Sequence, residues 1–169
     1  MGSPKALHSM GSAVWQTPPE ILDLYRASLG GIDTDPCTHE GAIARVGAHT
    51  YGTEARPLPL RAWVGQVYCN PPSPPYPWWE ACVTYSALHP DRGVGFLAYS
   101  LEILTQIARE GFPAGARLYL APARIRFLRP DGAPGDRPSH GSAAIMLGSH
   151  DPRPWARAGW ARFDHVEAP

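Results

Sequence analysis

The sequence contains no long hydrophobic run. No stretch of about 18 consecutive apolar residues occurs, so no transmembrane helix is expected, and the first residues lack the apolar segment of a signal peptide. We therefore expect a protein of the cytoplasm without a membrane partner. Residues 1–12 are small and polar and are interpreted as a disordered leader or as residues added for expression, whereas 13–169 are expected to form a single domain.

Cysteine is scarce. The three cysteines, Cys37, Cys69 and Cys82, form no C-x-x-C pair, which argues against a disulfide scaffold and favours a reducing compartment. Cys37 and His39 are closer in the sequence than zinc ligands usually are, and the sequence contains no second pair of ligands to complete a site. The sequence therefore predicts no metal site. A cysteine nucleophile is not indicated either, because no residue is placed to orient a base.

The chain also lacks net charge. Its 15 Lys and Arg residues balance 15 Asp and Glu residues, whereas nucleic-acid-binding domains usually carry a basic surface. The distribution is uneven, because residues 1–116 carry a net charge of −3 and residues 117–169 a net charge of +3. The positive residues of the second part are all arginines, which suit bidentate phosphate contacts. The arginines that flank the predicted loop 129–141 are candidate DNA contacts: Arg124, Arg126, Arg129 and Arg137. The alternative is a solvated surface of mixed charge, with Arg124 in a buried structural pair.

What remains is the composition of one globular domain. The 169 residues are 44% hydrophobic and 18% charged, which is typical of a folded chain large enough for a buried core. The 20 prolines predict many stiff loops. Hydrophobic periodicity and capping residues predict helices over 18–29, 41–46, 78–88 and 101–110, and strands over 32–36, 64–69, 93–99, 117–121 and 143–147.

This order of elements predicts an α/β fold. Strands that alternate with helices indicate a mostly parallel, twisted sheet with helices on both faces. In such sheets ligands bind beyond the carboxyl ends of the strands, which directs attention to residues 33–40, 70–79 and 99–102. Thr17 is expected to cap the first helix, and Ser100 is expected to cap the helix that begins at Leu101.

Asn70-Pro71-Pro72 follows a predicted strand directly. The two prolines fix the backbone, so the Asn70 amide oxygen and the Pro71 carbonyl form a rigid pair of hydrogen-bond acceptors. Such a pair can bind both hydrogens of an aromatic amine and free the nitrogen lone pair for attack on an electrophilic methyl group. The alternative is a proline-rich loop in which Asn70 caps the next helix.

Four motifs occur in a fixed order along the chain. They are Trp15-x-Thr17-Pro18, Asp33-x-Asp35-Pro36-Cys37, Asn70-Pro71-Pro72, and Arg124-Ile125-x-Phe127 before a strand. In order and spacing these motifs resemble those of the phage-type DNA N-6-adenine methyltransferases, the small Dam-like enzymes carried by prophages. The likeness covers about residues 14–148, most of the chain.

The resemblance implies a Rossmann-like methyltransferase fold, S-adenosylmethionine as the methyl donor, and DNA as the substrate, with the target adenine flipped out of the duplex. It places Trp15, Thr17 and Pro18 at the methionine end of the cofactor. It also puts Asp33, Asp35 and Cys37 in the cofactor pocket, where a carboxylate can bind the ammonium group or a ribose hydroxyl. It implies a catalytic motif of Asn70, Pro71, Pro72 and Ser73. The residues alone leave other roles open: core packing for Trp15, a helix cap for Thr17, and a turn for the two aspartates.

The chain departs from the family at two points. The family usually has an aromatic residue directly after Asn-Pro-Pro, where it stacks on the flipped base, and this chain has Ser73. Tyr76 and Trp79 are the candidates for a replacement ring, because Trp78 shares a helical stripe with apolar residues and is expected in the core. The glycine-rich cofactor loop common in methyltransferases is also absent, because residues 35–41 hold one glycine.

These departures leave three functions open. The first is transfer of a methyl group to the exocyclic amine of adenine in DNA. The second is a related enzyme that acts on a different base or transfers a different group. The third is an inactive methyltransferase-like module that binds DNA or a protein. Nothing resembles a large target-recognition domain, so sequence specificity should be short unless a homodimer or the 129–141 loop supplies it.

Overall fold

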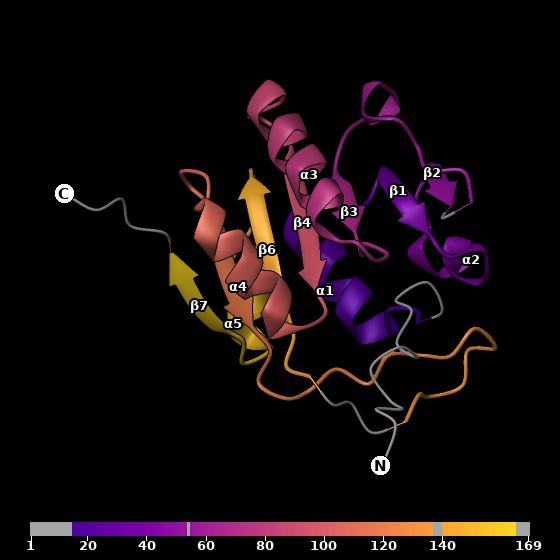
Figure 1. The fold of residues 1–169 in the computed structure, drawn as a ribbon. Helices are drawn as coiled ribbons and strands as arrows, with labels where there is room; N and C mark the ends of the chain where they lie inside the picture. The colour runs from indigo at the N-terminus through magenta and orange to yellow at the C-terminus, as the bar shows by residue number, and fades with distance from the viewer. Residues whose placement is uncertain (1–14, 54, 137–139, 165–169) are drawn as a thin grey trace, which may run out of the picture.

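A seven-stranded sheet forms the centre of the protein (Figure 1). The computed structural model describes residues 15–53, 55–136 and 140–164. The strands lie in the order β2-β1-β3-β4-β6-β5-β7. β1 to β4 pair in parallel, β5 runs in the same direction, and β6 and β7 run against their neighbours. The sheet is therefore mostly parallel, as predicted. The strands are β1 (Thr34–Thr38), β2 (Thr50–Thr53), β3 (Val67–Cys69), β4 (Gly93–Ala98), β5 (Arg117–Leu120), β6 (Ala143–Gly148) and β7 (Ala161–Asp164).

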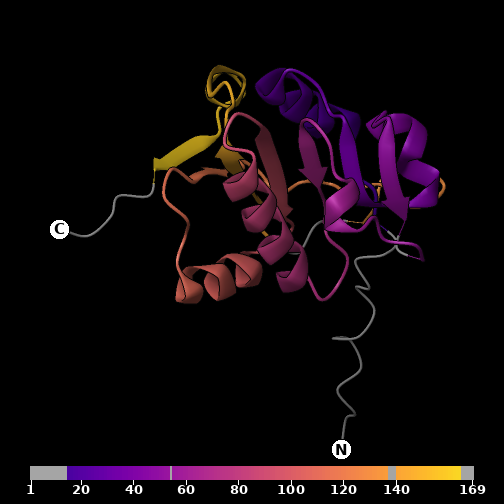
Figure 2. The same ribbon diagram turned by 90° about the horizontal axis from the view of Figure 1, so that it is seen from above.

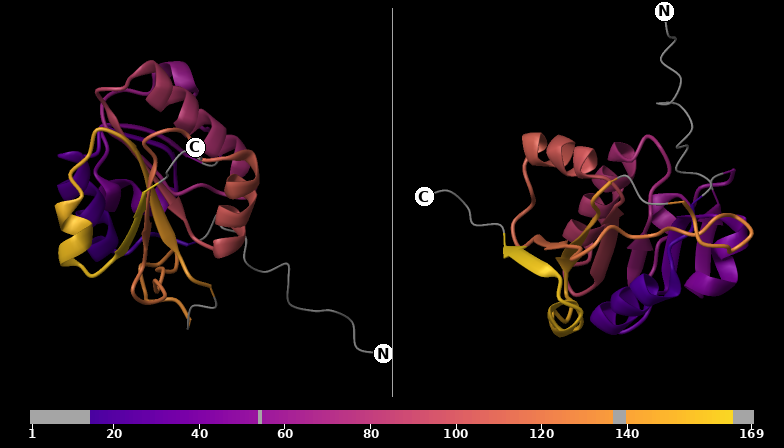
Figure 3. Two further views of the ribbon diagram at one scale, coloured as in Figure 1. Left: turned by 90° about the vertical axis from the view of Figure 1, so that its left-hand side faces the viewer. Right: turned by 90° about the horizontal axis from the view of Figure 1, so that it is seen from below.

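Helices cover both faces of this sheet (Figure 3), which confirms the mixed α/β architecture. α1, α2 and α5 pack on one face, and α3 and α4 pack on the other, as the view from above also shows for the longer helices (Figure 2). Within the described ranges no helix is long and apolar enough to cross a membrane. The helices are α1 (Pro19–Leu29), α2 (Ile43–Val46), α3 (Tyr76–Leu88), α4 (Leu101–Glu110) and α5 (Arg153–Arg157), with short 3₁₀ turns η2 (Glu40–Ala42) and η3 (Leu60–Ala62).

The elements with the strongest sequence patterns form as predicted. α4 has the predicted bounds, α1 begins one residue later than predicted, and Gly30 ends α1 in the left-handed conformation at a φ of 80°. Such a conformation suits glycine because it has no Cβ. Every residue of β4 is buried, because helices cover the sheet on both faces. The predicted leader, residues 1–12, lies outside the described residues.

The side-chain caps predicted for these helices are wrong. The residue before α1 is Pro18, with no side-chain cap, and Pro19 takes the first helical position. The Thr17 hydroxyl instead hydrogen-bonds to the Tyr68 hydroxyl, 2.6 Å away. Ser100 does stand at the capping position of α4, but its side chain makes no capping hydrogen bond. The backbone of α1 thus begins without help from Thr17, which leaves its hydroxyl for another role.

The buried face of α3 also differs from the prediction. The residues that face the sheet are Trp79, Cys82 and Tyr85, whereas Trp78 is half-buried. Trp79 is only 2% exposed, and its ring packs edge-on against Phe96, with the two ring centres 5.4 Å apart. The expectation of an exposed Trp79 that could stack on a base is therefore wrong. Its large ring fills the centre of the interface between helix and sheet, where burial of apolar area is greatest.

Three short elements were not predicted from sequence. β2 contains Gly52 and forms by parallel pairing with β1, a contact that no local pattern encodes. α5 is about one turn long, and β7 is exposed at all four residues, so neither displays a stripe of apolar residues. Short edge elements of this kind depend on tertiary pairing more than on propensity.

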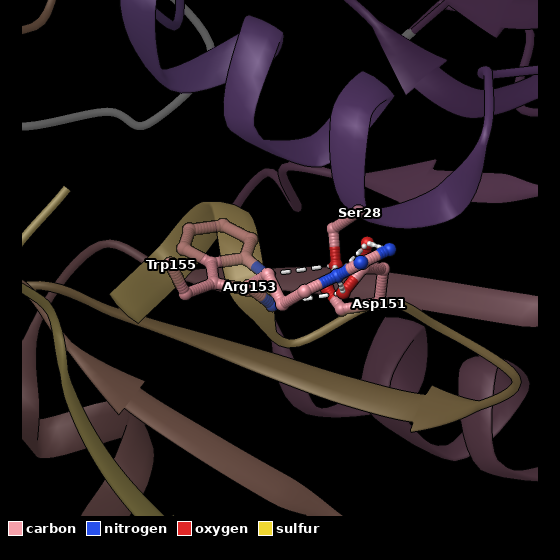
Figure 4. Close-up of polar contacts among 4 residues, drawn as sticks. All are labelled: Ser28, Asp151, Arg153 and Trp155. Carbon is pink, nitrogen blue, oxygen red and sulfur yellow. Dashed lines mark hydrogen bonds and ion pairs between the residues drawn. The ribbon is translucent and has the colours of Figure 1, made fainter. Parts of the chain in front are cut away.

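The C-terminal segment is held to α1 by a buried hydrogen-bond group (Figure 4). The Trp155 indole donates to the Ser28 hydroxyl at 2.9 Å, and that hydroxyl donates to the Asp151 carbonyl at 2.6 Å. Asp151 N–H returns a bond to the Ser28 carbonyl at 2.8 Å. The half-buried Asp151 carboxylate pairs with Arg153, which lowers the pKa of that carboxyl to about 2. Trp155 is fully buried among the rings of Tyr25, Tyr119 and Trp160. These bonds therefore hold the C-terminal segment and α1 together on one face of the sheet.

Replacing Ser28 with alanine should destabilise the fold. The Ser28→Ala change leaves a buried indole N–H and a backbone carbonyl unpaired, which should lower the free energy of unfolding by about 2–4 kcal/mol. Urea denaturation would measure the effect. The control is Ser149→Ala, an exposed serine that should change stability by less than about 0.5 kcal/mol. In a Trp155→Phe background no indole N–H remains, so Ser28→Ala should cost less there. Equal costs in the two backgrounds would contradict the proposed bond.

Candidate functional site

The sheet has a switch point between β1 and β3. After β1 the chain passes to β2 on one side, and after β2 it returns to β3 on the other side of β1. The ladder between β1 and β3 consists of a single pair, Thr34 and Val67, and nearer the carboxyl ends the two strands meet through the Cys37 and Cys69 sulfurs, 3.6 Å apart. In open α/β sheets ligands bind in the crevice at such a point. The geometry therefore indicates the carboxyl ends of β1 and β3 as the place to look for a site.

A small hollow lies at this place. Its cavity volume is about 20 Å³, space for roughly one water molecule and much less than a nucleoside requires. Its lining comes from three separated parts of the chain: the segment before α1, the carboxyl end of β1 with the turns that follow, and the end of β3. The lining residues are Trp15, Gln16, Thr17, Asp35, Cys37, Thr38, His39, Ala42, Val46, Tyr68 and Asn70.

Asp35 is held in this hollow by an irregularity in β1. The register between β1 and β2 shifts between Asp35 and Thr38, where β1 has one residue more than β2. Pro36 lies inside this bulge, and it has no N–H for a ladder bond. The N–H of Cys37 donates to Asp35 Oδ1 at 3.3 Å. The local sequence Asp-Pro-Cys thus turns the Asp35 carboxylate back onto its own backbone and leaves it at the crevice.

The Asp35 carboxyl is an unusual group. It is only 2% exposed, and burial raises its pKa to about 7, an effect that hydrogen bonds from the Cys37 backbone and the Thr38 side chain offset only in part. Within the described residues no cationic side chain pairs with it. Strongly perturbed carboxyls that line a cleft are candidate binding or catalytic groups. A ligand that brought a positive charge or a hydrogen-bond donor would stabilise the charged form of Asp35.

Asn70 occupies the other wall of the hollow. Its Nδ2 donates to the Thr17 hydroxyl at 3.1 Å, and that hydroxyl is 2.6 Å from the Tyr68 hydroxyl. Its Oδ1 has no partner among the described residues. The Cys37 thiol donates to the Asn70 backbone carbonyl at 3.5 Å and holds the end of β3 against β1. The side chain of Asn70 is therefore fixed at its donor end and open at its acceptor end.

His39 is the third polar residue of the hollow whose side chain is held by a hydrogen bond. Its Nδ1 accepts from the Gly41 N–H at 3.1 Å, which fixes the neutral ring in the form that carries its hydrogen on Nε2. The hollow therefore combines two acceptors, the Asp35 carboxyl and Asn70 Oδ1, with one ring donor. Within the described residues no group of three or more His, Cys, Asp or Glu side chains is arranged to hold a metal ion.

The structure brings together five of the residues predicted from sequence. Trp15, Thr17, Asp35, Cys37 and Asn70 all line the hollow. Asp33 and Pro18 do not. Asp33 precedes β1 at the opposite edge of the sheet, where Oδ2 accepts from the Gln66 N–H at 2.7 Å. This placement gives Asp33 a structural use, as the anchor of the turn before β3.

The rest of the predicted catalytic motif lies beside the hollow. Pro71 is buried, Pro72 is half-buried and Ser73 is exposed, and none of the three lines it. Tyr76 begins α3, half-buried against the opposite face from α1. Neither Tyr76 nor Trp79 brings a ring to the hollow, and the rings that do line it are those of Trp15 and Tyr68.

The predicted arginines lie on the connection between β5 and β6. This segment runs along the carboxyl edge of the sheet as far as α2 and returns (orange in Figure 1). It is tied to Gln16 by paired backbone bonds with Leu128, both 2.8 Å. Ile125 is buried and Phe127 half-buried, so the alternating Arg124 and Arg126 are exposed on the other side. Arg129 pairs with Asp136 at 2.7 Å, and Arg137 lies outside the described residues.

Six lining residues were not named from sequence. Gln16, Thr38 and His39 adjoin predicted residues, so their neighbourhood could have suggested them. Tyr68 lies in a predicted strand one residue before its end, which places it beside Asn70. Ala42 and Val46 enter from a turn of helix packed against α1, and no sequence signal indicates their role.

Comparison with known proteins identifies no relative. No protein-family model matches the sequence, no curated protein is similar to it, and no solved structure matches its fold. The motifs and the geometry of the site therefore carry the functional argument alone.

Asp35 should make the stability of the protein depend on pH. Because its pKa is raised in the folded state, the fold holds a proton that the unfolded chain releases near pH 4, and stability should fall as the pH rises from about 4 to 7. Asp35→Asn removes this proton. The variant should gain stability relative to the parent by a few kcal/mol between pH 4 and pH 8, on the order of 4 at most.

Urea denaturation at pH 4.5, 6 and 8 would measure this difference. Glu20→Gln, an exposed carboxylate in the first turn of α1, is the matched control and should show no such gain. A constant difference between Asp35→Asn and the parent over this range would show that Asp35 is not protonated in the fold.

Proposed function

We propose that this protein is an S-adenosylmethionine-dependent methyltransferase that acts on the exocyclic amine of adenine in DNA. One observation carries the proposal. The Asn70 amide stands at the end of β3, fixed through Nδ2 with Oδ1 open, across a switch-point hollow from the buried Asp35 carboxyl. An oriented acceptor for an amine and a buried acceptor for a cationic cofactor are the two groups that such a reaction needs.

The sheet supports the proposal. It is mostly parallel and carries helices on both faces, which is the arrangement that the resemblance to methyltransferases implies. Asn70-Pro71-Pro72 follows the strand beside β1, so the motif lies at the switch point, where a cofactor on β1 and a base on β3 would meet.

The polar groups of the hollow fit the methionine end of the cofactor. Asp35 would bind the ammonium group, and the His39 ring N–H would suit an acceptor such as the carboxylate. Thr17 and Trp15 line the same hollow as Asp35 and His39. The cofactor would supply one electrophilic methyl group and leave as a neutral thioether.

The hollow must widen to hold a nucleoside. On the side of the β5–β6 connection, Gln16 Nε2 donates to the Pro130 carbonyl at 3.0 Å, and Arg45 donates to Gln16 Oε1. Such side-chain contacts can exchange for bonds to a ligand at small net cost. Because two backbone bonds hold Leu128 to Gln16, we expect an opening at Pro130 when a cofactor binds, with Leu128 kept in place.

Asn70 and Pro71 would hold the amine of the base. Pro71 is fixed by its ring, and its carbonyl accepts no hydrogen bond within the described residues. With Asn70 Oδ1 it would bind both amine hydrogens and direct the nitrogen lone pair toward the methyl donor. Both acceptors are neutral, so they would position the hydrogens while the proton that the amine loses passes to water. No ring from positions 73, 76 or 79 lines the site, and Tyr68 is buried, so stacking of the base would fall to the half-buried Trp15.

The exposed arginines favour DNA as the substrate. Arg124 and Arg126 face away from the core on the connection that borders the hollow. Guanidinium groups at this edge would contact phosphates on either side of a flipped base. The expected homodimer and the cytoplasmic location stay predictions.

A second function is favoured by two of the same observations. The small cavity and the absence of a ring after Asn-Pro-Pro suit a module that binds DNA without a cofactor. This module would bind DNA equally well with and without S-adenosylmethionine and would not bind the cofactor alone. The other alternative is a related enzyme that modifies another base or transfers another group. Such an enzyme would bind a cofactor in the same pocket but would leave adenine unmethylated.

Asn70→Ala should abolish methyl transfer and leave the cofactor site intact. Loss of a preorganised acceptor should reduce kcat by about 100-fold or more, measured as methyl-labelled DNA and identified by mass spectrometry of the nucleosides. Calorimetric titration with S-adenosylmethionine should give similar affinities for the variant and the parent. Gln106→Ala, an exposed amide on α4, is the control. Full activity of Asn70→Ala would contradict the catalytic role, and a parent that binds no cofactor would favour the binding module.

Removing Arg124 and Arg126 should weaken DNA binding in a salt-dependent way. Each phosphate that the variant no longer binds should reduce the slope of log K against log salt concentration by about 1. Fluorescence anisotropy with labelled duplex DNA at several salt concentrations would measure the slope for Arg124→Gln, Arg126→Gln and the double variant. Arg61→Gln, in η3 before the amino end of β3, should behave as the parent. An unchanged slope in the double variant would remove these arginines from the DNA interface.

A further inference from the structure

Three side chains from three parts of the chain form one hydrogen-bonded series beside the hollow. Tyr68 lies on β3, Asn70 follows β3, and Thr17 precedes α1. The Tyr68 hydroxyl is 2.6 Å from the Thr17 hydroxyl, which accepts from Asn70 Nδ2 at 3.1 Å. Tyr68 is 1% exposed and Thr17 is 4% exposed, so water does not compete for these bonds.

The Thr17 hydroxyl is not needed for the helix that follows it. The N-cap residue of α1 is Pro18, and α1 has no side-chain cap. A buried hydroxyl is costly unless it is hydrogen-bonded, and both partners of this one belong to the Asn70 wall. The hydroxyl therefore serves the Asn70 side chain and not the helix.

An asparagine amide has two nearly isosteric orientations that differ in function. Rotation by a half-turn exchanges the oxygen acceptor for the NH₂ donor. If Asn70 faced the hollow with NH₂, it would repel an amine, which also presents hydrogens. A hydroxyl that accepts from Nδ2 favours the orientation in which Oδ1 faces the ligand.

The threonine is suited to this task because its own orientation is fixed. β-Branched side chains have few χ1 conformations, and the bond with the Tyr68 hydroxyl selects the direction of the Thr17 hydroxyl. Thr17 can accept from Asn70 through one lone pair while it shares a hydrogen with Tyr68. The orientation of Asn70 is thus determined by buried groups and does not depend on the ligand.

We propose that Thr17 is a positioning residue that holds the Asn70 amide with its oxygen directed at the substrate amine. This role rests on the proposed function and replaces the expectation that Thr17 contacts the cofactor. Thr17 does not touch the reacting atoms and acts only through Asn70. Tyr68 serves the same end one step further from the site.

Thr17→Val tests the proposal, because it removes the hydroxyl and keeps the shape. This variant should lose about tenfold in kcat, the value of one hydrogen bond, while the KM for DNA and the affinity for S-adenosylmethionine change by less than about twofold. Thr17→Ser keeps the hydroxyl and should restore most of the rate. Cavity or packing effects alone would impair the serine variant as much as the valine variant.

The orientation of the amide can be measured without catalysis. In the ¹⁵N spectrum the Asn70 side-chain amide is identified by its absence from Asn70→Ala. One of its hydrogens should exchange with water slowly in the parent and in Thr17→Ser, and at least about tenfold faster in Thr17→Val. If the parent transfers no methyl group, the proposed function fails, and this exchange comparison still decides whether Thr17 holds the amide.

Two results would overturn the proposal. One is an unchanged kcat in Thr17→Val, and the other is an unchanged exchange rate of the Asn70 amide. Should Thr17→Val fail to fold, Tyr68→Phe removes the outer member of the series and should raise the exchange rate in the same direction. An Asn70 amide that is equally protected in Tyr68→Phe and in the parent would reject the series as the cause of its orientation.

Discussion

The candidate site depends on the extra residue in β1. Pro36 cannot donate a ladder hydrogen bond, and β1 accommodates it by a shift of register against β2 between Asp35 and Thr38. The Cys37 N–H that this shift exposes donates to Asp35, and the pairing of β1 with β3 does not extend beyond Thr34. The bulge therefore holds the Asp35 carboxyl at the hollow, which Asn70 lines from the end of β3.

The buried carboxyl shows that the fold is not optimised for stability alone. Within the described residues every buried side-chain nitrogen and oxygen has a hydrogen-bond partner, so the core is fully satisfied in hydrogen bonds. The charge of the Asp35 carboxylate is not compensated, because the group has backbone and hydroxyl partners but no cationic partner among the described residues. Burial without a compensating charge favours the protonated acid and costs stability above its pKa. Buried carboxyls with a strongly perturbed pKa cluster at binding and catalytic sites, which distinguishes Asp35 from the exposed carboxylates of the chain.

The sequence predicts the parts of the fold that have a local pattern. The stripe of α1, the continuous apolar run of β4 and the proline that follows Asn70 each encode an element or its end. β2, α5 and β7 form through pairing with distant strands or through Trp155, whose partners Ser28 and Tyr25 lie more than a hundred residues earlier, and no local pattern records this. α3 shows the intermediate case, because the helix was evident while the choice between Trp78 and Trp79 depended on the sheet it covers.

The residues of the candidate site were predictable only where a local sequence pattern, such as the end of a strand, marked them. Asn70 follows the carboxyl end of β3, where the strand rule finds it. Asp35 is the second residue of β1 and reaches the hollow where the strand becomes irregular, whereas Asp33 directly precedes β1 and bonds to the Gln66 N–H. Neither the irregularity nor the bounds of β1 could be predicted from the sequence. The series of Thr17, Tyr68 and Asn70 joins positions about 50 residues apart, so it emerges from packing and not from spacing.

The segment before α1 connects the two sides of the site. Thr17 bonds to Asn70, and its neighbour Gln16 pairs with Leu128 and donates to the Pro130 carbonyl. The connection that carries Arg124 and Arg126 is therefore tied to the same segment that bonds to the Asn70 amide. A cofactor that widened the hollow would have to exchange the Gln16 bonds, and a DNA phosphate bound by the arginines would act on the same segment. Binding of the two ligands should thus be coupled through Gln16, with a coupling free energy limited to the few hydrogen bonds that both ligands alter.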